Sequence, residues 1–351
     1  MSKVSLKALL YSGLVSSGLM GASAPALAAD PWTFNAYFEN DLFGGTDDNY
    51  TNGVRFSWVS PNLDNYNDDE RLPLWLRRIN AQFTPLYPVP ESYSDQVMRK
   101  LIFTVGQEMY TPEDKERKTV DPDDRPYAGW LYFGFGYHAR TNNQMNSVEV
   151  NLGIVGPHSY AHETQDFIHE LRDIDTFAGW DNQLDDELGV QVIFERKDRV
   201  LANFYTPSLQ YDVITHYGGS LGNVQTYANA GVEYRLGWSL PDDFGTSSLR
   251  PGGDNSAPGN RDPRLKYKAR GFHGFVSLDA RAVAHNIFLD GNTFSDSHSV
   301  DKEYFVADAA FGFAWVYDRW KVSYAHVYRT KEFRTKEKAQ KYGSISVSYS
   351  Y

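Results

Sequence analysis

The last nine residues, 343–351, alternate small polar side chains with large apolar ones. Because successive side chains of a strand point to opposite faces, four serines would line one face and the large side chains the other: Ile345, Val347, Tyr349 and Tyr351. An outer-membrane β-barrel needs such a strand, since one face meets lipid and the other a polar interior, with aromatic residues at the water boundary. The edge strand of a secreted β-sandwich is the alternative.

Residues 1–28 have the composition of a secretory signal peptide. Lys3 and Lys7 supply its positive charge, and an apolar stretch, 8–20, follows them. Ala26-Leu27-Ala28 has the small-x-small form of a cleavage site. We therefore expect a signal peptide over 1–28 and one outer-membrane β-barrel domain over 29–351.

The composition narrows the functional classes. Aromatic residues make up 15% of the chain, with 24 Tyr and 8 Trp, which suits the aromatic girdles of a membrane barrel. The absence of Cys excludes disulfides and a thiol nucleophile. Without the two signal lysines the chain has 32 basic and 45 acidic residues, a formal charge of −13, so we expect no nucleic acid partner. Clustered carboxylates favour a hard divalent cation instead.

Segments of period two recur along the chain, separated by stretches rich in turn-forming residues. They predict an all-β fold, a twelve-stranded antiparallel transmembrane outer-membrane β-barrel, because single-chain bacterial barrels have even strand numbers. The predicted strands are 32–43, 50–60, 99–110, 127–140, 146–155, 187–197, 202–215, 224–238, 269–285, 302–317, 318–330 and 342–351.

Two long stretches, 62–99 and 241–268, fall on connections that this count places in the periplasm, where barrel turns are usually short. Either they are long periplasmic excursions or a strand has been miscounted. Within the second, 245–264 is rich in Gly, Pro, Ser, Asn and Asp, and we expect it to be mobile.

The sequence of one extracellular connection predicts a short helix. Residues 161–171 contain neither Gly nor Pro, and Gln165 and His169 are four apart, so they would share a helix face. A histidine held above the barrel rim could act as a general base, because its pKa lies near working pH. On composition alone His162 is an equal candidate.

The first hairpin contains a second group of candidate site residues. Asn40 and Asp41 end the first strand just before Gly44-Gly45, where a carboxylate and backbone carbonyls could surround an ion. Thr51 begins the next strand and can sit opposite this corner. An ordinary polar turn is the alternative, because Asn and Asp also favour turns.

The segment 121–130 combines two prolines with Asp–Arg pairs that can hold a loop locally. We expect a structural role for it, with Tyr127 and Trp130 in the aromatic girdle.

Taken together, several segments resemble the lipid A 3′-O-deacylase family, in the same order and over most of the mature chain. They are Glu39-Asn40-Asp41-x-Phe43, Asn49-Tyr50-Thr51-Asn52-Gly53, Gly106-Gln107-x-x-Tyr110-Thr111-Pro112, Asp124-Arg125-Pro126-Tyr127-Ala128-Gly129-Trp130, Gly153-Ile154-Val155-Gly156-Pro157, Gln165 with His169, Gly179-Trp180-Asp181-Asn182-Gln183-Leu184 and Glu332-Phe333-Arg334-Thr335. The resemblance implies a calcium-dependent hydrolase that removes the 3′-linked acyloxyacyl chain of lipid A in the outer leaflet.

Residue by residue, the resemblance implies a catalytic set of His169, Asn40, Asp41, Thr51 and Gln165. It further implies Ca²⁺ as cofactor, with Asp41 and Asp175 as ligands, although Asp175 stands where the family has Glu. A basic residue of the family aligns loosely with 115–118. The implied partners are lipopolysaccharide and outer-membrane lipids, and we expect a monomer in the bacterial outer membrane.

The implied chemistry is coherent. His169 would take a proton from water, while Ca²⁺ near Asp41 would polarise the ester carbonyl and stabilise the oxyanion. Two other functions remain open from the sequence, namely a passive outer-membrane channel or structural barrel, and an outer-membrane phospholipase.

Overall fold

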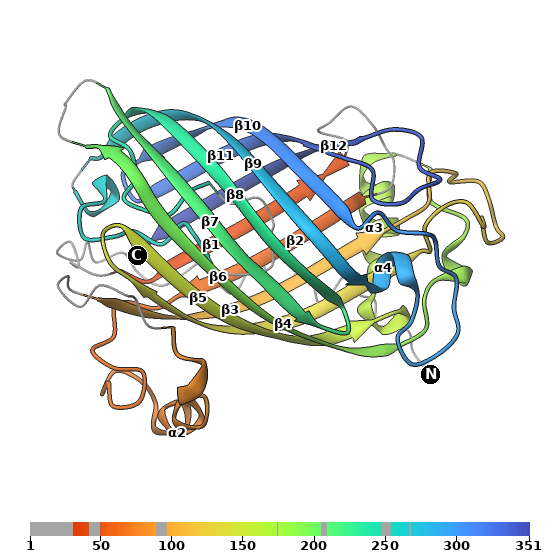
Figure 1. Ribbon diagram of the computed structural model, residues 1–351, viewed down its shortest axis with the longest axis horizontal. Coiled ribbons are helices and arrows are strands. Elements are labelled where there is room, and N and C mark those ends of the chain that lie inside the picture. Colours follow the sequence, from red (N-terminus) through yellow and green to blue (C-terminus); the bar gives the residue numbers. More distant parts are fainter. Residues whose placement is uncertain are drawn as a thin grey trace.

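The computed structural model describes residues 31–41, 50–88, 97–173, 175–204, 209–246, 254–266 and 268–351. Within these residues twelve antiparallel strands close into one barrel, in which each strand pairs with its sequence neighbours and β12 pairs with β1 (Figure 1). The predicted twelve-stranded all-β barrel is confirmed. The strands are β1 Thr33–Asn40, β2 Tyr50–Val59, β3 Met98–Tyr110, β4 Ala128–Arg140, β5 Gln144–Val155, β6 Glu187–Asn203, β7 Gln210–Gly222, β8 Gln225–Trp238, β9 Arg270–Asn286, β10 Phe305–Tyr317, β11 Trp320–Arg329 and β12 Gln340–Ser350.

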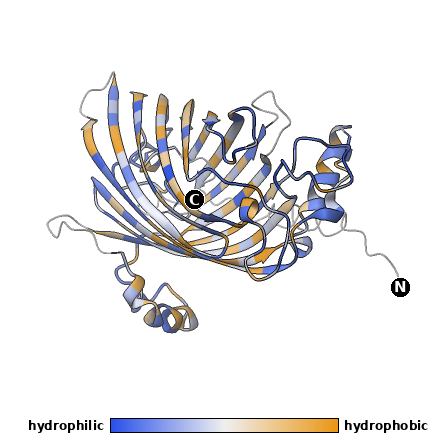
Figure 2. Ribbon diagram, turned by 45° about the vertical axis from the view of Figure 1, so that its right-hand side comes forward, coloured by the Kyte–Doolittle hydropathy of each residue, from blue (hydrophilic) through white to orange (hydrophobic). Residues whose placement is uncertain are grey.

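The alternation of β12 has the predicted sense. Its serines are buried, whereas Ile345, Val347 and Tyr349 are partly exposed on the outer face. The same alternation of hydrophilic and hydrophobic residues runs along the other strands (Figure 2). It places large apolar side chains such as Phe133 and Trp315 on the outside, where a membrane barrel meets lipid.

The predicted boundaries of two neighbouring strands are wrong. The sequence predicts strands over 187–197 and 202–215, but β6 continues to Asn203 and β7 spans Gln210–Gly222. The charged end of β6 stays in the strand because its inward side chains form ion pairs in the lumen. Arg199, for example, is buried and donates to Asp212 at 3.1 Å. A polar run in a barrel strand therefore does not indicate a turn when its charges pair inside.

Alternate connections of an antiparallel barrel lie at opposite ends. We call one end the α3 end, because it carries α3 (Ala161–Arg172) together with α4 (Ile287–Asp290). We call the opposite end the terminus end, because β1 starts and β12 ends there; it also carries α2 (Leu74–Gln82) (Figure 1). The long connections 60–97 and 239–269 both lie at the terminus end, so the strand count is right and both are excursions. Among the described residues, no helix is long and apolar enough to cross a membrane.

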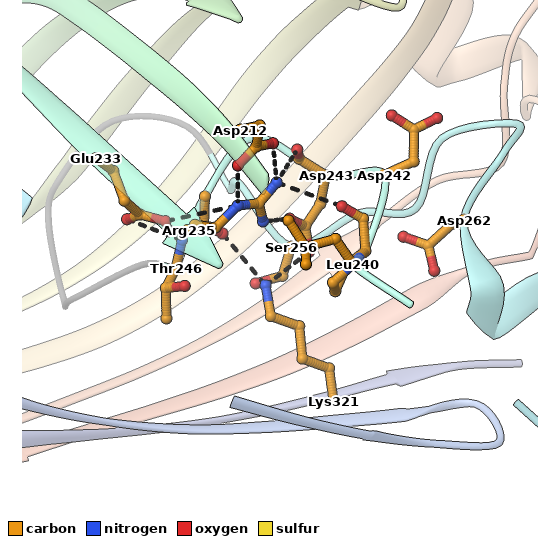
Figure 3. Close-up of polar contacts among 12 residues, drawn as sticks. Asp212, Glu233, Arg235, Leu240, Asp242, Asp243, Thr246, Ser256, Asp262 and Lys321 are labelled. Atoms are coloured by element: carbon orange, nitrogen blue, oxygen red, sulfur yellow. Dashed lines mark hydrogen bonds and ion pairs between the residues drawn. The ribbon is translucent and has the colours of Figure 1, made fainter. Parts of the chain in front are cut away.

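The second excursion folds back into the barrel, and we call its described parts, 240–246 and 254–266, the plug. The expectation that 245–264 is mobile is wrong for 254–264, where acidic side chains are buried in ion pairs and hydrogen bonds; 247–253 lie outside the described residues. Asp243 accepts from Lys321 at 2.6 Å and from Arg235 at 2.5 Å (Figure 3). It also accepts from Arg264 at 3.2 Å. The composition of the plug predicts a mobile loop, but its polar residues pair with charged residues of the lumen rather than with water.

A second segment covers the lumen at the α3 end. Phe288 of α4 stacks on Tyr110 at 4.2 Å between ring centroids, in a buried cluster that includes Trp130 and Tyr132. Trp130 lies opposite Glu108 in the register of β3 and β4, and both side chains point into the lumen. The predicted girdle position of Trp130 is therefore wrong. Tyr127, the residue before β4, is also buried, in a cluster with Ala161 of α3. A small luminal cavity remains below α4, lined by charged and polar side chains that include Glu39, Glu108 and Arg329.

Candidate functional site

The α3 helix forms where it is predicted and lies against the outside of the barrel wall. Glu108 and Tyr110 line the luminal cavity, so Met109 between them faces outward, as does its partner Gly129 on β4. A Cβ atom on Gly129 would lie 2.2 Å from Oγ of Ser159 and 2.3 Å from Cβ of Ala161. The glycine of the Tyr-Ala-Gly-Trp segment is therefore what lets the helix start reach the wall.

An apolar cluster fixes α3 and the segment that follows it on this wall. Its members come from β3, the residue before β4, α3 and the segment after α3: Met109, Tyr127, Ala161, Phe177 and Trp180. Because the cluster is buried on the outer face, α3 is held by packing rather than hanging from a free loop. Such support is what a precisely oriented side chain requires.

His169 has one defined tautomer in this setting. The side chain is only 3% exposed, its Nδ1 lies 2.7 Å from the carbonyl oxygen of Asp175, and its ring centroid lies 5.7 Å from that of Phe177. A carbonyl can only accept, so Nδ1 must carry the proton and donate it. In the neutral ring Nε2 then has the lone pair that a general base needs.

Gln165, one turn earlier on α3, is also held in one orientation. Its Oε1 accepts from Nε1 of Trp180 at 2.6 Å. An indole N–H can only donate, so the oxygen of the amide must face Trp180. The amide nitrogen of Gln165 is buried and has no hydrogen-bond partner among the described residues, so it remains available as a donor.

The end of the first hairpin lies on the same outer face. Asn40 follows luminal Glu39 in β1, so it faces outward, and its register partner on β2 is Asn52. The register partner of Asn52 on β3 is Met109, which lies beneath α3. Strands are about 4.8 Å apart, so Asn40 and Met109 are roughly 10 Å apart along this row. Asn40 and Asp41 are both buried. The structure thus brings the first hairpin and α3 to one patch of the outer wall, at the α3 end.

Thr51 is described only by its backbone. It lies in β2 next to Asn52, at a register shift against β3 between Tyr50 and Asn52. Bulges of this kind are over-represented next to active sites, where they redirect a side chain. The side chain of Thr51 and residues 42–49 lie outside the described part of the structure, so the role of Thr51 stays a prediction.

The remaining predicted residues differ in their surroundings. The side chain of Asp175 is exposed, and the contact it makes to His169 uses its backbone carbonyl, so its role as an ion ligand stays a prediction. The side chain of His162 is 39% exposed, pairs with Asp166 at 3.1 Å and stacks on Trp180. Within 115–118, Lys115 has its Nζ 5.4 Å from the ring centroid of Phe177, which also contacts His169.

Comparisons with known proteins agree with the barrel fold. The family model described as outer membrane protein LpxR matches residues 13–351. The chain belongs to the LpxR family. LpxR from Salmonella typhimurium is similar in structure, with a TM-score of 0.68 and 17% sequence identity, covering 91% of this chain and 100% of that one. This family membership and the barrel fold place the protein in the outer membrane.

Two further solved structures are less similar. The β domain of the Bordetella autotransporter BrkA has a TM-score of 0.40 at 6% identity, covering 92% of this chain and 99% of that one. The translocator domain of NalP from Neisseria meningitidis has a TM-score of 0.34 at 8% identity, covering 98% and 96%. A search of curated proteins found no match.

The patch of this LpxR-family barrel contains oxygen atoms of the kinds that bind a hard cation. Among the described residues, no group of three or more His, Cys, Asp or Glu is arranged to hold a metal. Calcium, however, also accepts amide and backbone oxygens and water. Asp41 is a fully buried carboxylate, and Oδ1 of Asn52 is buried without a hydrogen-bond partner in the described structure. Sequence reasoning missed Asn52, although its cross-strand pairing with Asn40 was the signal that could have found it.

Proposed function

We propose that this protein is a calcium-dependent lipid A 3′-O-deacylase, which hydrolyses the ester of the 3′-linked acyloxyacyl chain. The observation that carries the proposal is the tautomer of His169, set by the carbonyl of Asp175 on a helix packed against the outer wall. Membership of the LpxR family and the earlier resemblance to lipid A deacylases support the choice of substrate.

In the proposed reaction, Nε2 of His169 takes a proton from a water molecule, whose oxygen attacks the ester carbonyl carbon. The ester C–O bond then breaks, and His169 returns the proton to the leaving sugar oxygen, so that the acyl chain is released as a carboxylic acid and the sugar keeps a hydroxyl group. The Nδ1 proton stays on the ring and stabilises the cation that forms, through its bond to the carbonyl of Asp175. The free N–H group of Gln165 donates to the carbonyl oxygen as negative charge develops there. Preorganised donors of this kind typically contribute about 3–4 kcal/mol of transition-state stabilisation.

Asp41, Asn40 and Asn52 would hold the calcium ion, because they place a buried carboxylate and amide oxygens at one corner. When bound, the ion would polarise the ester carbonyl and stabilise the oxyanion. Thr51 and Asp175 remain proposed members of this site.

The position of the patch suits a lipid substrate. Bacterial barrels have long extracellular loops, and the α3 end carries most of the long connections, so we infer that it borders the outer leaflet. A site on the outer wall there would receive lipid A sideways from the leaflet. A passive channel is less well supported, because the plug and α4 fill the lumen near its two ends.

The test is hydrolysis by the purified protein in mixed micelles, followed by mass spectrometry. The proposal expects loss of the 3′ acyl groups of lipid A when calcium is present and no loss after chelation. Release of fatty acid from glycerophospholipid, with lipid A intact, would favour the phospholipase alternative. No change in either lipid would favour a structural barrel.

A further inference from the structure

The connection between β2 and β3 forms a small lobe outside the barrel. We call residues 60–88 the β2–β3 lobe, and α2 is its helix. Its apolar core packs Leu63, Tyr66, Leu72 and Leu76 against two residues of the barrel, Leu101 and Tyr137. In Figure 1 the lobe projects from the terminus end, and Figure 2 shows it beside the barrel from a second direction.

The lobe rests on the lipid-facing side of the wall. Leu101 lies seven residues before luminal Glu108 in a strand of regular register, so it points outward, as does its cross-strand partner Tyr137. Both are buried only because the lobe covers them. A lobe on this face must lie at the edge of the membrane.

The lipid-facing belt begins directly beside the lobe. The next outward pair toward the α3 end is Phe103 and Phe135, whose rings are 5.2 Å apart and which pack partly against the lobe. The pair after that includes Phe133, which is 65% exposed. The lobe therefore continues a surface that is already in contact with lipid.

The α2 helix is apolar on a second face that the lobe does not cover. Leu76 and Asn80 are buried, and Asn80 accepts from the hydroxyl of Tyr137 at 3.1 Å. Trp75 and Ile79 nevertheless expose 61% and 43% of their surface, and Phe83 follows them. At about 100° per residue these three lie in one stripe roughly 80° wide.

The charge of α2 matches a phospholipid surface. The helix contains Arg77 and Arg78 and no acidic residue, and Arg78 is exposed. Long basic side chains can reach lipid phosphates while Trp sits at headgroup level. Helices with an apolar stripe and basic flanks lie in the plane of a membrane interface.

We propose that α2 is an interfacial helix, which rests in the phospholipid headgroup layer of the leaflet at the terminus end. Trp75, Ile79 and Phe83 insert toward the acyl chains, and Arg78 contacts the phosphates. This contact fixes how deeply and at what tilt the barrel sits. It is independent of the hydrolysis proposed above.

The cysteine-free chain allows a direct test. The full-length variants Ile79→Cys and Glu70→Cys each carry one nitroxide label, and both positions are on the lobe; Glu70 is the exposed polar control. In phosphatidylethanolamine–phosphatidylglycerol vesicles, collision with oxygen reports lipid contact and collision with a water-soluble nickel chelate reports water. Heat-dependent gel mobility verifies folding.

The label at position 79 should collide with oxygen several-fold more, and with the nickel chelate several-fold less, than the label at position 70. Equal nickel accessibility at the two positions would overturn the proposal, as would protection of position 79 from both reagents. Either result would show that α2 faces water or a protein surface.

Discussion

The indole N–H of Trp180 donates to Oε1 of Gln165 at 2.6 Å, inside the cluster that holds α3 against the barrel wall. Replacing Trp180 by Phe keeps an aromatic ring in the cluster but removes this donor. The amide of Gln165 can then rotate, so kcat should fall about tenfold, the equivalent of one buried hydrogen bond. KM should change little.

Steady-state hydrolysis of lipid A in micelles measures both constants. Trp315→Phe on the exposed outer face is the matched control and should leave them unchanged. A Trp180→Phe enzyme with wild-type kcat would show that the orientation of Gln165 does not matter.

Gly129 permits close contact between the wall and the start of α3. In Gly129→Ala the new methyl group would meet Ser159 and Ala161 at 2.2–2.3 Å, so the helix must shift. We expect activity to fall sharply and the free energy of unfolding to drop by about 1–3 kcal/mol. At Gly274 the nearest atom to a new Cβ is 3.7 Å away, so Gly274→Ala should behave as wild type in urea unfolding and in the activity assay.

Asn52 tests the cation corner. If its Oδ1 completes the coordination of calcium, Asn52→Ala should raise the calcium concentration needed for half-maximal activity about tenfold or more, while activity recovers at saturating calcium. A calcium titration of the activity measures this shift. Asn65→Ala, in the distant β2–β3 lobe, should leave the titration unchanged, and an identical curve for both variants would remove Asn52 from the site.

The plug should stabilise the barrel in a pH-dependent manner. Burial alone would raise the pKa of Asp243, but the charges of Lys321, Arg235 and Arg264 outweigh burial and hold that pKa well below its usual range. A carboxylate with a lowered native pKa stabilises the fold fully above its unfolded-state pKa of about 4. That stabilisation is lost as the pH falls from there through the native pKa.

Asp243→Asn should therefore lower the free energy of unfolding at pH 7 by about 3–5 kcal/mol, because three buried cations lose a shared partner. The difference from wild type should shrink as the pH drops below about 4. Urea unfolding in micelles at several pH values gives both quantities. Asp296→Asn, at an exposed position, is the control, and a pH-independent difference would contradict the ionic explanation.

The barrel was predictable because its main signal is local. The alternation that ends with Tyr349 and the strand count both follow from a period of two. The α3 helix was predictable for the same reason, since 161–171 has no helix breaker.

The features that the sequence did not predict depend on contacts that a local sequence pattern does not reveal. The plug looked like an unstructured loop, because nothing near Asp243 in sequence reveals Lys321 or Arg264. Trp130 looked like a girdle residue, because only the register shows that it points inward. Asn52 and Trp180 belong to recognisable segments, but the sequence alone does not show that Asn52 lies opposite Asn40 in the hairpin or that Trp180 contacts Gln165.

The most direct test of the account compares two histidines of one helix. His169→Asn and His162→Asn are each expressed in cells whose lipid A carries 3′ acyl chains, and the lipid A is analysed by mass spectrometry. Loss of a general base typically costs about 10²–10⁴-fold in rate, so His169→Asn should leave the 3′ chains in place while His162→Asn removes them like wild type. Deacylation by a folded His169→Asn protein would contradict the central claim.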